Sequence, residues 1–377
     1  MPAVPPPPPA PPSLVERARH RPLLALAVVA LVAWVAGLAG AVVGNRIARD
    51  DSSPARTPST LGLVRAEPRT EPLPSMDAYA AASAIGPSVV SIDVVAAGTE
   101  GVLRGSGTGV VLTADGEIVT NAHVVEGATS VRVRLPGETE PRIATVLISD
   151  PARDLALLRI DADALRPAEF ADPADIRVGD EVAAVGFALG LDGDPSVTVG
   201  IVSALHRTSA DEQKALKNLI QTDAPISSGN SGGPLVNSLG QVVGIITFVA
   251  VADLGSQAND LGFAISNAEL LPNIERLREE VDGGLVPIGF LGVQLAPRDD
   301  GGSGALVTDV VADSPAELAG VLVGDAVVSI DGVPITGEAG LVATIRDHAP
   351  GDEITIDIRR DGEPITVTAT LAPRPPD

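Results

Sequence analysis

The segment "PISSGNSGGPLVN", from Pro225 to Asn237, places Ser231 between glycines and directly before a short apolar run. Such a segment is either a flexible Gly-Ser linker or a turn that holds one hydroxyl group in place. Glycine permits backbone angles that other residues avoid, so the glycines fit both interpretations. Residues elsewhere in the chain distinguish between them.

Gly229 to Gly233 also match the G-x-S-x-G pattern of the nucleophile elbow in α/β-hydrolases. That elbow needs a strand before the serine, a helix after it and a histidine later in the chain. Here "PLVN" has the pattern of a strand and follows the serine, and the only later histidine is His348, in a separate C-terminal module. The order of these elements therefore argues against the α/β-hydrolase fold.

Residues 76–282 contain short runs rich in Val, Ile and Leu, which recur roughly every ten residues between turn signals. We expect a β-hairpin around Asp115-Gly116 and a closing helix from Asn267 to Val281. Because helical patterns are otherwise rare here, the spacing favours antiparallel β-barrels or sandwiches, and so a mainly β domain.

Residues 285–374 form a second predicted module, with a small sheet and two helices. Ser314 fits an N-cap of the first helix, and Gly320 fits the position just past its end. Asp331-Gly332 and Asp361-Gly362 are typical of tight hairpin turns. The second helix is expected within "GLVATIRDH".

The N-terminal part contains an uncharged apolar run at residues 23–44. A run of this length spans a hydrocarbon core of roughly 30 Å, so we expect a retained transmembrane helix rather than the shorter apolar region of a cleaved signal peptide. The Pro-rich residues 1–22 are predicted to form a cytoplasmic tail, and residues 45–75 a disordered linker. The remaining domains would then lie outside the cytoplasm.

The composition excludes several functional classes. The net charge of −23 argues against nucleic acid as a partner, because nucleic acid requires a basic surface. The chain has no cysteine, so disulfides, thiolate metal sites and cysteine nucleophiles are excluded. No cofactor and no metal are predicted.

A serine nucleophile needs a base within hydrogen-bond reach, and histidine is the usual one. The chain has four histidines. His20 precedes the apolar span, His206 lies in a polar segment, and His348 lies in the C-terminal module. His123, in "IVTNAHVVEG", follows a predicted strand in the same domain as Ser231, so it is the candidate base.

A buried carboxylate commonly orients such a histidine. Asp154 is the candidate because it heads the apolar strand "LALLRI"; Asp150 and Asp161 are the nearest rivals. Backbone N–H groups of Gly229 and Ser231, on either side of Asn230, are candidate donors to the oxyanion that forms during acyl transfer.

At these residues the sequence resembles the HtrA (Deg) family of chymotrypsin-like serine proteases. The resemblance rests on several segments in order: 105–125, 154–160, 199–205, 220–247 and, for a PDZ domain, 289–295 and 310–335. It implies a double β-barrel protease domain followed by a PDZ domain, with His123, Asp154 and Ser231 as the catalytic triad. It also implies an oxyanion hole formed by Gly229, Asn230 and Ser231.

The resemblance further implies a PDZ loop that binds a peptide's C-terminal carboxylate, formed by Gly289, Phe290, Leu291 and Gly292. It places Ile245, Ile246 and Thr247 at the substrate pocket, where the family often has Ile-Asn-Thr. Pro225 stands where a trypsin-like specificity would need an acid, so we expect a small or aliphatic P1 residue. Ser227-Ser228 replace the family's frequent Asn-Pro, and the switching of the oxyanion turn is expected to differ there.

The predicted function is therefore a membrane-anchored serine endopeptidase of extracytoplasmic protein quality control. Its expected partners are misfolded polypeptides, C-terminal peptides at the PDZ groove, and two further copies of the chain in a homotrimer. The alternative is a PDZ-centred sensor or a chaperone-like binding protein with a latent protease site. The complete triad favours the enzyme, since a pure binding protein needs none of these groups.

Overall fold

The computed structural model describes residues 62–68, 71–98, 101–190, 193–210, 215–249, 261–283 and 287–374. No helix within these ranges is long and apolar enough to cross a membrane. The predicted span at residues 23–44 and the Pro-rich tail lie outside the described residues.

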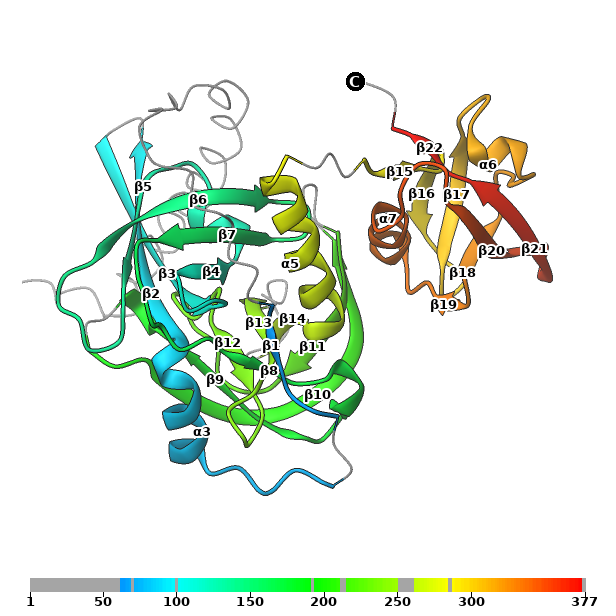
Figure 1. Cartoon of the computed structure of the whole chain (residues 1–377). Helices are drawn as coiled ribbons and strands as arrows, with labels where there is room; N and C mark the ends of the chain where they lie inside the picture. The colour runs from blue at the N-terminus through cyan, green and yellow to red at the C-terminus, as the bar shows by residue number, and fades with distance from the viewer. Residues whose placement is uncertain are drawn as a thin grey trace, which may run out of the picture. The chain divides into compact units, whose positions relative to one another are not determined.

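Six antiparallel strands close the first β-barrel, in the order β2-β3-β4-β7-β6-β5 (Figure 1). Their bounds are β2 Val89–Gly98, β3 Gly101–Val111, β4 Glu117–Thr120, β5 Ala128–Arg134, β6 Arg142–Asp150 and β7 Leu155–Ile160. The hairpin between β3 and β4 turns at Asp115-Gly116 as predicted, and Gly116 has φ of 101°. A side chain there would collide with the Ile160 carbonyl, which lies 2.3 Å from an added Cβ.

The second barrel follows the order β13-β12-β9-β10-β11-β14 and closes because β14 also pairs with β13. The strands are β9 Glu181–Gly186, β10 Ser196–Ala210, β11 Ala215–Thr222, β12 Pro234–Val236, β13 Val242–Val249 and β14 Gly262–Ser266. The predicted mainly β, two-barrel fold is confirmed. The sequence pattern did not reveal β6, β11 or β14. Polar residues interrupt the apolar alternation in β6 and β11, and β14 has only five residues.

Two short strands extend the second barrel's sheet in parallel register, β8 Glu169–Phe170 on β13 and β1 Val64–Arg65 on β8. The structure differs here from the prediction of a disordered linker at 45–75. The Ala66 N–H donates to the Phe170 carbonyl at 2.8 Å, and Leu63 packs against the core. Strand pairing and an apolar contact thus order part of this segment.

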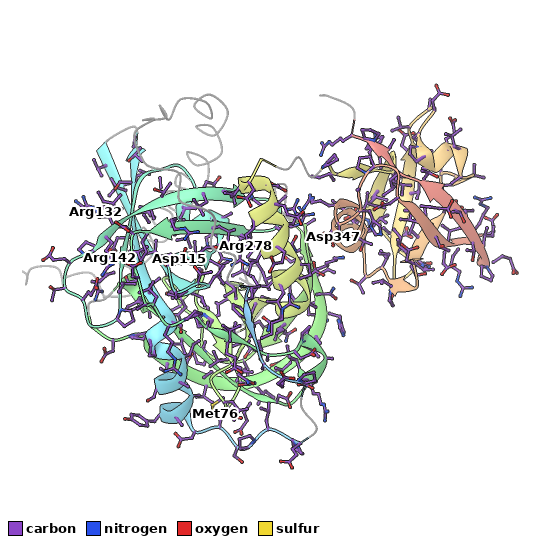
Figure 2. The ribbon with its side chains drawn as sticks, viewed as in Figure 1. Met76, Asp115, Arg132, Arg142, Arg278 and Asp347 are labelled. Atoms are coloured by element: carbon purple, nitrogen blue, oxygen red, sulfur yellow. The ribbon has the colours of Figure 1, made fainter. Side chains whose placement is uncertain are left out.

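Helix α5, Asn267–Val281, has the predicted bounds and contacts strands of both barrels, β6 of the first and β13 and β14 of the second (Figure 1). Its residue Arg278, labelled in Figure 2, donates from Nε to the buried Glu117 carboxylate of β4 at 2.8 Å. Two further helices were not predicted: α3, Ala78–Ile85, and the single turn α4, Ala122–Val125. Asp77 caps α3 by accepting the Ala80 N–H.

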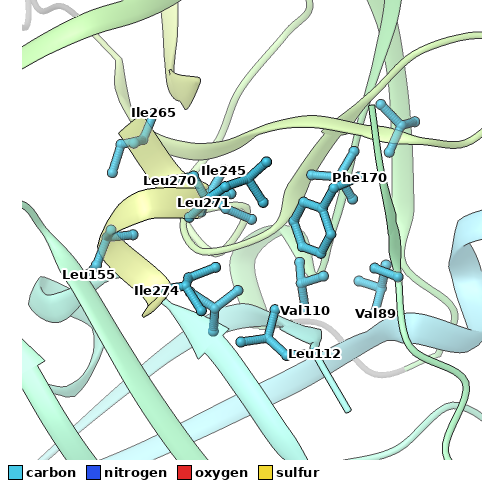
Figure 3. Packing of buried hydrophobic residues seen from close by; sticks show 14 of the residues in the cluster. Val89, Val110, Leu112, Leu155, Phe170, Ile245, Ile265, Leu270, Leu271 and Ile274 are labelled. Carbon is cyan, nitrogen blue, oxygen red and sulfur yellow. The ribbon is translucent and has the colours of Figure 1, made fainter. Parts of the chain in front are cut away.

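Each barrel has its own core, and a third and larger core joins them with α5. Figure 3 shows part of this joint core, where Leu155 of β7 and Ile245 of β13 lie with Leu270, Leu271 and Ile274 of α5. Leu155 and Ile245 are both fully buried. This packing fixes the start of β7 and the middle of β13, the two positions from which the candidate site is built.

The C-terminal module is a sheet in the order β16-β17-β18-β20-β21 with two helices. Its elements are β15 Gly289–Phe290, β16 Val293–Pro297, β17 Ala305–Val310, α6 Pro315–Leu318, β18 Ala326–Ile330, β19 Val333–Pro334, α7 Glu338–Arg346, β20 Glu353–Arg360, β21 Glu363–Thr370 and β22 Ala372–Pro373. The predicted cap is confirmed, since the Ser314 hydroxyl accepts the Glu317 N–H. Both predicted turns, Asp331-Gly332 and Asp361-Gly362, have positive φ at each residue, as a tight hairpin requires.

Asp325, immediately before β18, is held by Arg360 of β20 through two hydrogen bonds of 2.8 Å. Burial raises the pKa of Asp325, but the Arg360 guanidinium and the Leu322 N–H outweigh burial and hold this pKa below its ordinary value. A carboxyl group with a lowered folded-state pKa stabilises the fold above its unfolded pKa of about 4. That stabilisation is lost as the pH falls further.

The variant Asp325→Asn is therefore expected to destabilise this module by about 2 kcal/mol at neutral pH, the usual size of a hydrogen bond to a charged group. Amide hydrogen exchange of β18 and β20 measures the effect locally, and the difference should shrink below about pH 4. Asp300→Asn is a matched control, because Asp300 pairs with Arg298 in an exposed loop. Equal exchange in Asp325→Asn and the unsubstituted chain at neutral pH would contradict this role.

Candidate active site

His123 lies on the single turn α4, directly after β4, and its side chain is 31% exposed. The preceding Asn121 is fully buried, and its side-chain amide donates to the Asp154 carbonyl at 2.9 Å. The turn is thereby attached to the start of β7. A partly exposed ring on a fixed backbone can meet both a buried carboxylate and a substrate.

Asp154 is fully buried and immediately precedes β7. Both of its carboxylate oxygens lie 2.9 Å from His123 Nδ1, and the His123 backbone N–H donates to Oδ1 at 3.1 Å. Thr247 Oγ1 donates to Oδ2 at 2.5 Å. A buried carboxylate needs such donors to remain ionised.

The backbone at Asp154 has φ of 55°, a conformation that few residues other than glycine adopt. Aspartate tolerates it better than most side chains, and such local strain is found where the surrounding structure imposes a geometry. Here the conformation places the carboxylate against Nδ1 of His123. A ring that donates its Nδ1 proton to a carboxylate keeps Nε2 as an acceptor when it is neutral.

The two rival acids do not take this position. Asp150 accepts hydrogen bonds from Arg153 at 3.0 Å and from Arg276 at 2.5 Å. Asp161 follows the other end of β7. The sequence left open which of the three acids pairs with His123. The pairing of β4 with β7 brings Asp154 to His123.

Ser231 is partly exposed on the turn before β12. The Asn230 N–H donates to the Ser227 carbonyl at 3.1 Å, and Gly229 has φ of 98°, a left-handed conformation available to glycine. Gly232 and Gly233 donate to Ile246 and Asn230 carbonyls. Across the described residues, no hydrogen-bond partner accepts from the Gly229 and Ser231 N–H groups, so these two remain available to an oxyanion.

Thr247, near the end of β13, connects the groups from the two barrels. Its hydroxyl donates to Asp154 of the first barrel, and its backbone carbonyl accepts from Ser231 Oγ at 3.1 Å. The three predicted triad residues therefore meet around one threonine. The family resemblance places Thr247 at a substrate pocket, and nothing in the sequence indicates its contact with Asp154, because residues 154 and 247 are distant in the chain.

The other two residues predicted at the substrate pocket lie elsewhere. Ile245 is fully buried in the core that joins the barrels, and Ile246 is 1% exposed in the core of the second barrel. Strand alternation sends these neighbours to opposite faces of β13, and packed side chains cover both faces. Their side chains are not accessible to a substrate in this structure.

The predicted carboxylate loop precedes β16, which is the edge strand of its sheet. Within the loop, the Gly289 N–H donates to the His348 carbonyl, while the carbonyls of Leu291 and Gly292 accept from Ala316 and Val311. The Leu291 and Gly292 N–H groups have no acceptor among the described residues. Gly292 has φ of 87°, and a Cβ there would lie 2.3 Å from Ser314 Cβ.

The described residues contain no group of three or more His, Cys, Asp or Glu side chains that could hold a metal ion. The site itself brings together a serine, a histidine and a buried carboxylate, together with two unpaired N–H groups. That set fits acyl transfer to a hydroxyl nucleophile.

Comparisons with known proteins identify both domains of the chain. A family model described as a trypsin-like peptidase domain matches residues 107–245, and a PDZ domain model matches residues 289–371. A "Probable periplasmic serine endoprotease DegP-like" of Halomonas elongata is 37% identical over 281 residues, covering 72% of this chain and 57% of that protein. "Serine protease Do-like HtrB" of Bacillus subtilis is 37% identical over 289 residues, covering 70% and 61%.

Among solved structures, "HtrA-type protease AlgW with tripeptide" matches with a TM-score of 0.64 and 31% identity, covering 80% of this chain and 98% of that one. The chain spans between 54 and 64% of the length of the curated relatives. The two domain types occur in the expected order, and the 31% sequence identity extends over 98% of a solved relative. The chain belongs to the HtrA family of serine proteases, with a trypsin-like peptidase domain followed by a PDZ domain.

Proposed function

We propose that this chain is a serine endopeptidase in which Ser231 is the nucleophile, His123 the general base and Asp154 the carboxylate that orients His123. The observation that carries the proposal is a set of three hydrogen bonds: His123 Nδ1 to Asp154, the Thr247 hydroxyl to Asp154, and Ser231 Oγ to the Thr247 carbonyl. These bonds bring a base, an acid and a hydroxyl to one place beside two unpaired N–H groups.

The reaction begins when Ser231 Oγ turns from the Thr247 carbonyl to His123 Nε2. His123 takes the hydroxyl proton while Oγ attacks the peptide carbonyl carbon, and the carbonyl π-bond electrons move to its oxygen. The N–H groups of Gly229 and Ser231 stabilise that oxyanion. His123 then gives its proton to the leaving amine, which releases one product and leaves an acyl group on Ser231.

Water completes the cycle by the same route. His123 removes a proton from the water as its oxygen attacks the acyl carbon, and the collapse of the second oxyanion returns the proton to Ser231 Oγ. The Thr247 carbonyl, once Ser231 has turned away, is free to accept an N–H of the substrate. Position 225 holds a proline and not the acidic residue of a trypsin-like specificity, which supports a preference for a small or aliphatic P1 residue.

The C-terminal domain is proposed to bind the C-terminal end of a polypeptide. The unpaired N–H groups of Leu291 and Gly292 would hold the terminal carboxylate, and the peptide backbone would pair with the edge strand β16. We propose that the substrates are misfolded polypeptides in extracytoplasmic protein quality control. Relatives named as periplasmic endoproteases support the extracytoplasmic location. We propose a homotrimer as the working assembly.

Residues 23–44 are proposed to anchor the chain in the membrane, with residues 1–22 in the cytoplasm. The support is the uncharged apolar run itself. After alkaline extraction of membranes, the full chain should remain with the lipid and a variant lacking 23–44 should not. Release of both would contradict the anchor.

A fluorophosphonate probe tests the proposed chemistry, because it reacts with an activated serine. The purified chain should take up one label, located at Ser231 by mass spectrometry, and should cleave casein. A C-terminal peptide that occupies the PDZ groove is expected to raise the labelling rate. Absence of label and cleavage with and without this peptide would contradict the enzyme and favour a PDZ-centred binding protein.

A further inference from the structure

Thr108 lies on β3 of the first barrel, is fully buried, and forms four hydrogen bonds. Its N–H donates to the Ser231 carbonyl at 2.9 Å, and its hydroxyl donates to the Gly229 carbonyl at 2.7 Å. The hydroxyl also accepts the Phe187 N–H at 2.9 Å. Its carbonyl accepts from Thr120 Oγ1 at 2.7 Å. Every polar atom of this residue is therefore engaged.

The two bonds from Thr108 to the second barrel hold the Gly229–Asn230 and Ser231–Gly232 peptide groups, which alternate along the chain with the two peptide groups that carry the unpaired N–H groups. A peptide group is planar, so a fixed Gly229 carbonyl fixes the whole peptide between Gly229 and Asn230. Glycine has wide backbone freedom, so the φ of 98° at Gly229 must be maintained by its surroundings. The Thr108 hydroxyl supplies that constraint at the centre of the turn.

The space around these contacts is tightly filled. A Cβ added at Gly232 would lie 2.2 Å from the Thr108 carbonyl oxygen, and one added at Gly186 would lie 2.9 Å from Thr108 Oγ1. Valine has the shape of threonine without the hydroxyl. A valine at position 108 would fit this space and leave the Gly229 carbonyl without its donor.

The same hydroxyl connects the turn to the segment that follows β9. Phe187, which donates to it, is 4% exposed, and the Arg134 guanidinium lies 5.6 Å from the centre of its ring. Three residues further along the chain, a Cβ added at Gly190 would lie 2.6 Å from Ser106 Oγ of β3. The segment from Gly186 to Gly190 is thus packed on β3. Its position decides whether the Phe187 N–H can donate to the Thr108 hydroxyl.

We propose that Thr108 is a positioning residue for peptide hydrolysis. Its hydroxyl holds the turn in the conformation that leaves the Gly229 and Ser231 N–H groups available, and it ties this conformation to the segment 186–190. The inference rests on the proposed endopeptidase function for its kinetic consequences, but the conformation of the turn can be measured without activity.

The test compares Thr108→Val with Thr108→Ser in the full chain on a peptide substrate. Loss of one complete oxyanion donor costs about 100- to 1,000-fold in kcat, so a misoriented turn in Thr108→Val should cost about 10- to 100-fold. KM should stay within about twofold of that of the unsubstituted chain, because the oxyanion forms in the transition state and is absent from the bound substrate. Thr108→Ser keeps the hydroxyl and should retain kcat within about threefold.

Two readouts separate positioning from a general structural effect. The pH dependence of kcat/KM should be unchanged in Thr108→Val, since the contacts of His123 with Asp154 do not involve Thr108. Thr120→Val is the matched control, because it removes a buried threonine hydroxyl that donates to the Thr108 carbonyl and packs against Gly232 but forms no hydrogen bond with the Gly229 carbonyl. It should leave kcat close to that of the unsubstituted chain.

The amide resonance of Gly229 in a ¹H–¹⁵N NMR spectrum provides a readout independent of activity. It should shift in Thr108→Val and stay in place in Thr108→Ser. If Thr108→Val does not fold, Thr108→Ala lacks the same hydroxyl with less crowding and is measured instead. An unshifted Gly229 resonance, an unchanged kcat, or equal impairment of the serine variant overturns the proposal. If the unsubstituted chain shows no peptidase activity but the Gly229 resonance still shifts in Thr108→Val, only the proposed function is overturned.

Discussion

The variant Ser231→Ala is expected to lower kcat for peptide hydrolysis by about a millionfold, the cost of removing the nucleophile from such a triad. The fold should be unaffected, because the Ser231 side chain contributes one hydrogen bond, to the Thr247 carbonyl. Binding of substrate should persist, since the groups that contact it remain. Cleavage of a fluorogenic peptide, together with a binding measurement on the same peptide, separates these effects.

A double-variant comparison makes this prediction sharper. Groups that act as one unit are not additive, so Ser231→Ala with His123→Ala should be no slower than Ser231→Ala alone. The fluorophosphonate label should be absent from all these variants. A Ser231→Ala chain that retains activity within about tenfold of the unsubstituted chain would place the nucleophile elsewhere.

The variant Asp154→Asn is expected to lower kcat by about 10,000-fold with little change in the fold. An asparagine amide would donate to His123 Nδ1, so the ring would carry its proton on Nε2. That tautomer cannot accept the Ser231 proton. The measurement is kcat/KM against pH, with thermal unfolding as the check on stability.

Thr247→Val is the matched control for Asp154→Asn. It removes the hydroxyl that donates to Asp154 but keeps the carboxylate on His123 and the backbone carbonyl next to Ser231. A hydrogen bond to a charged group contributes about 1.5–3 kcal/mol, which corresponds to a loss of about ten- to a hundredfold. A larger loss in Thr247→Val than in Asp154→Asn would contradict the assignment of Asp154 as the orienting carboxylate.

Local features of the fold could be predicted because their causes are local. The bounds of α5, the N-cap at Ser314 and the turn at Asp361-Gly362 follow from residues adjacent in the chain. A helical apolar period, a hydroxyl before a helix and a residue pair that tolerates positive φ each act within a few positions. The structure agrees with the sequence at all of these.

The failures have an equally physical cause. The resemblance placed Ile245 and Ile246 at the substrate pocket, but their apolar side chains pack into two different cores. The single turn α4 is too short to show a helical period. Part of the predicted linker is ordered because Val64 and Arg65 pair with β8, a strand of only two residues that no pattern reveals.

By itself, the sequence determined the two modules, the mainly β architecture, and the candidate nucleophile, base and acid, because composition, spacing and chain order constrain these strongly. Only the tertiary structure decided how they are held. Closure of the two barrels brings Thr247 to Asp154 and Thr108 to the turn at Gly229. Those contacts join residues from different barrels, and a hydrogen bond between distant residues depends on three-dimensional packing that local pattern does not encode.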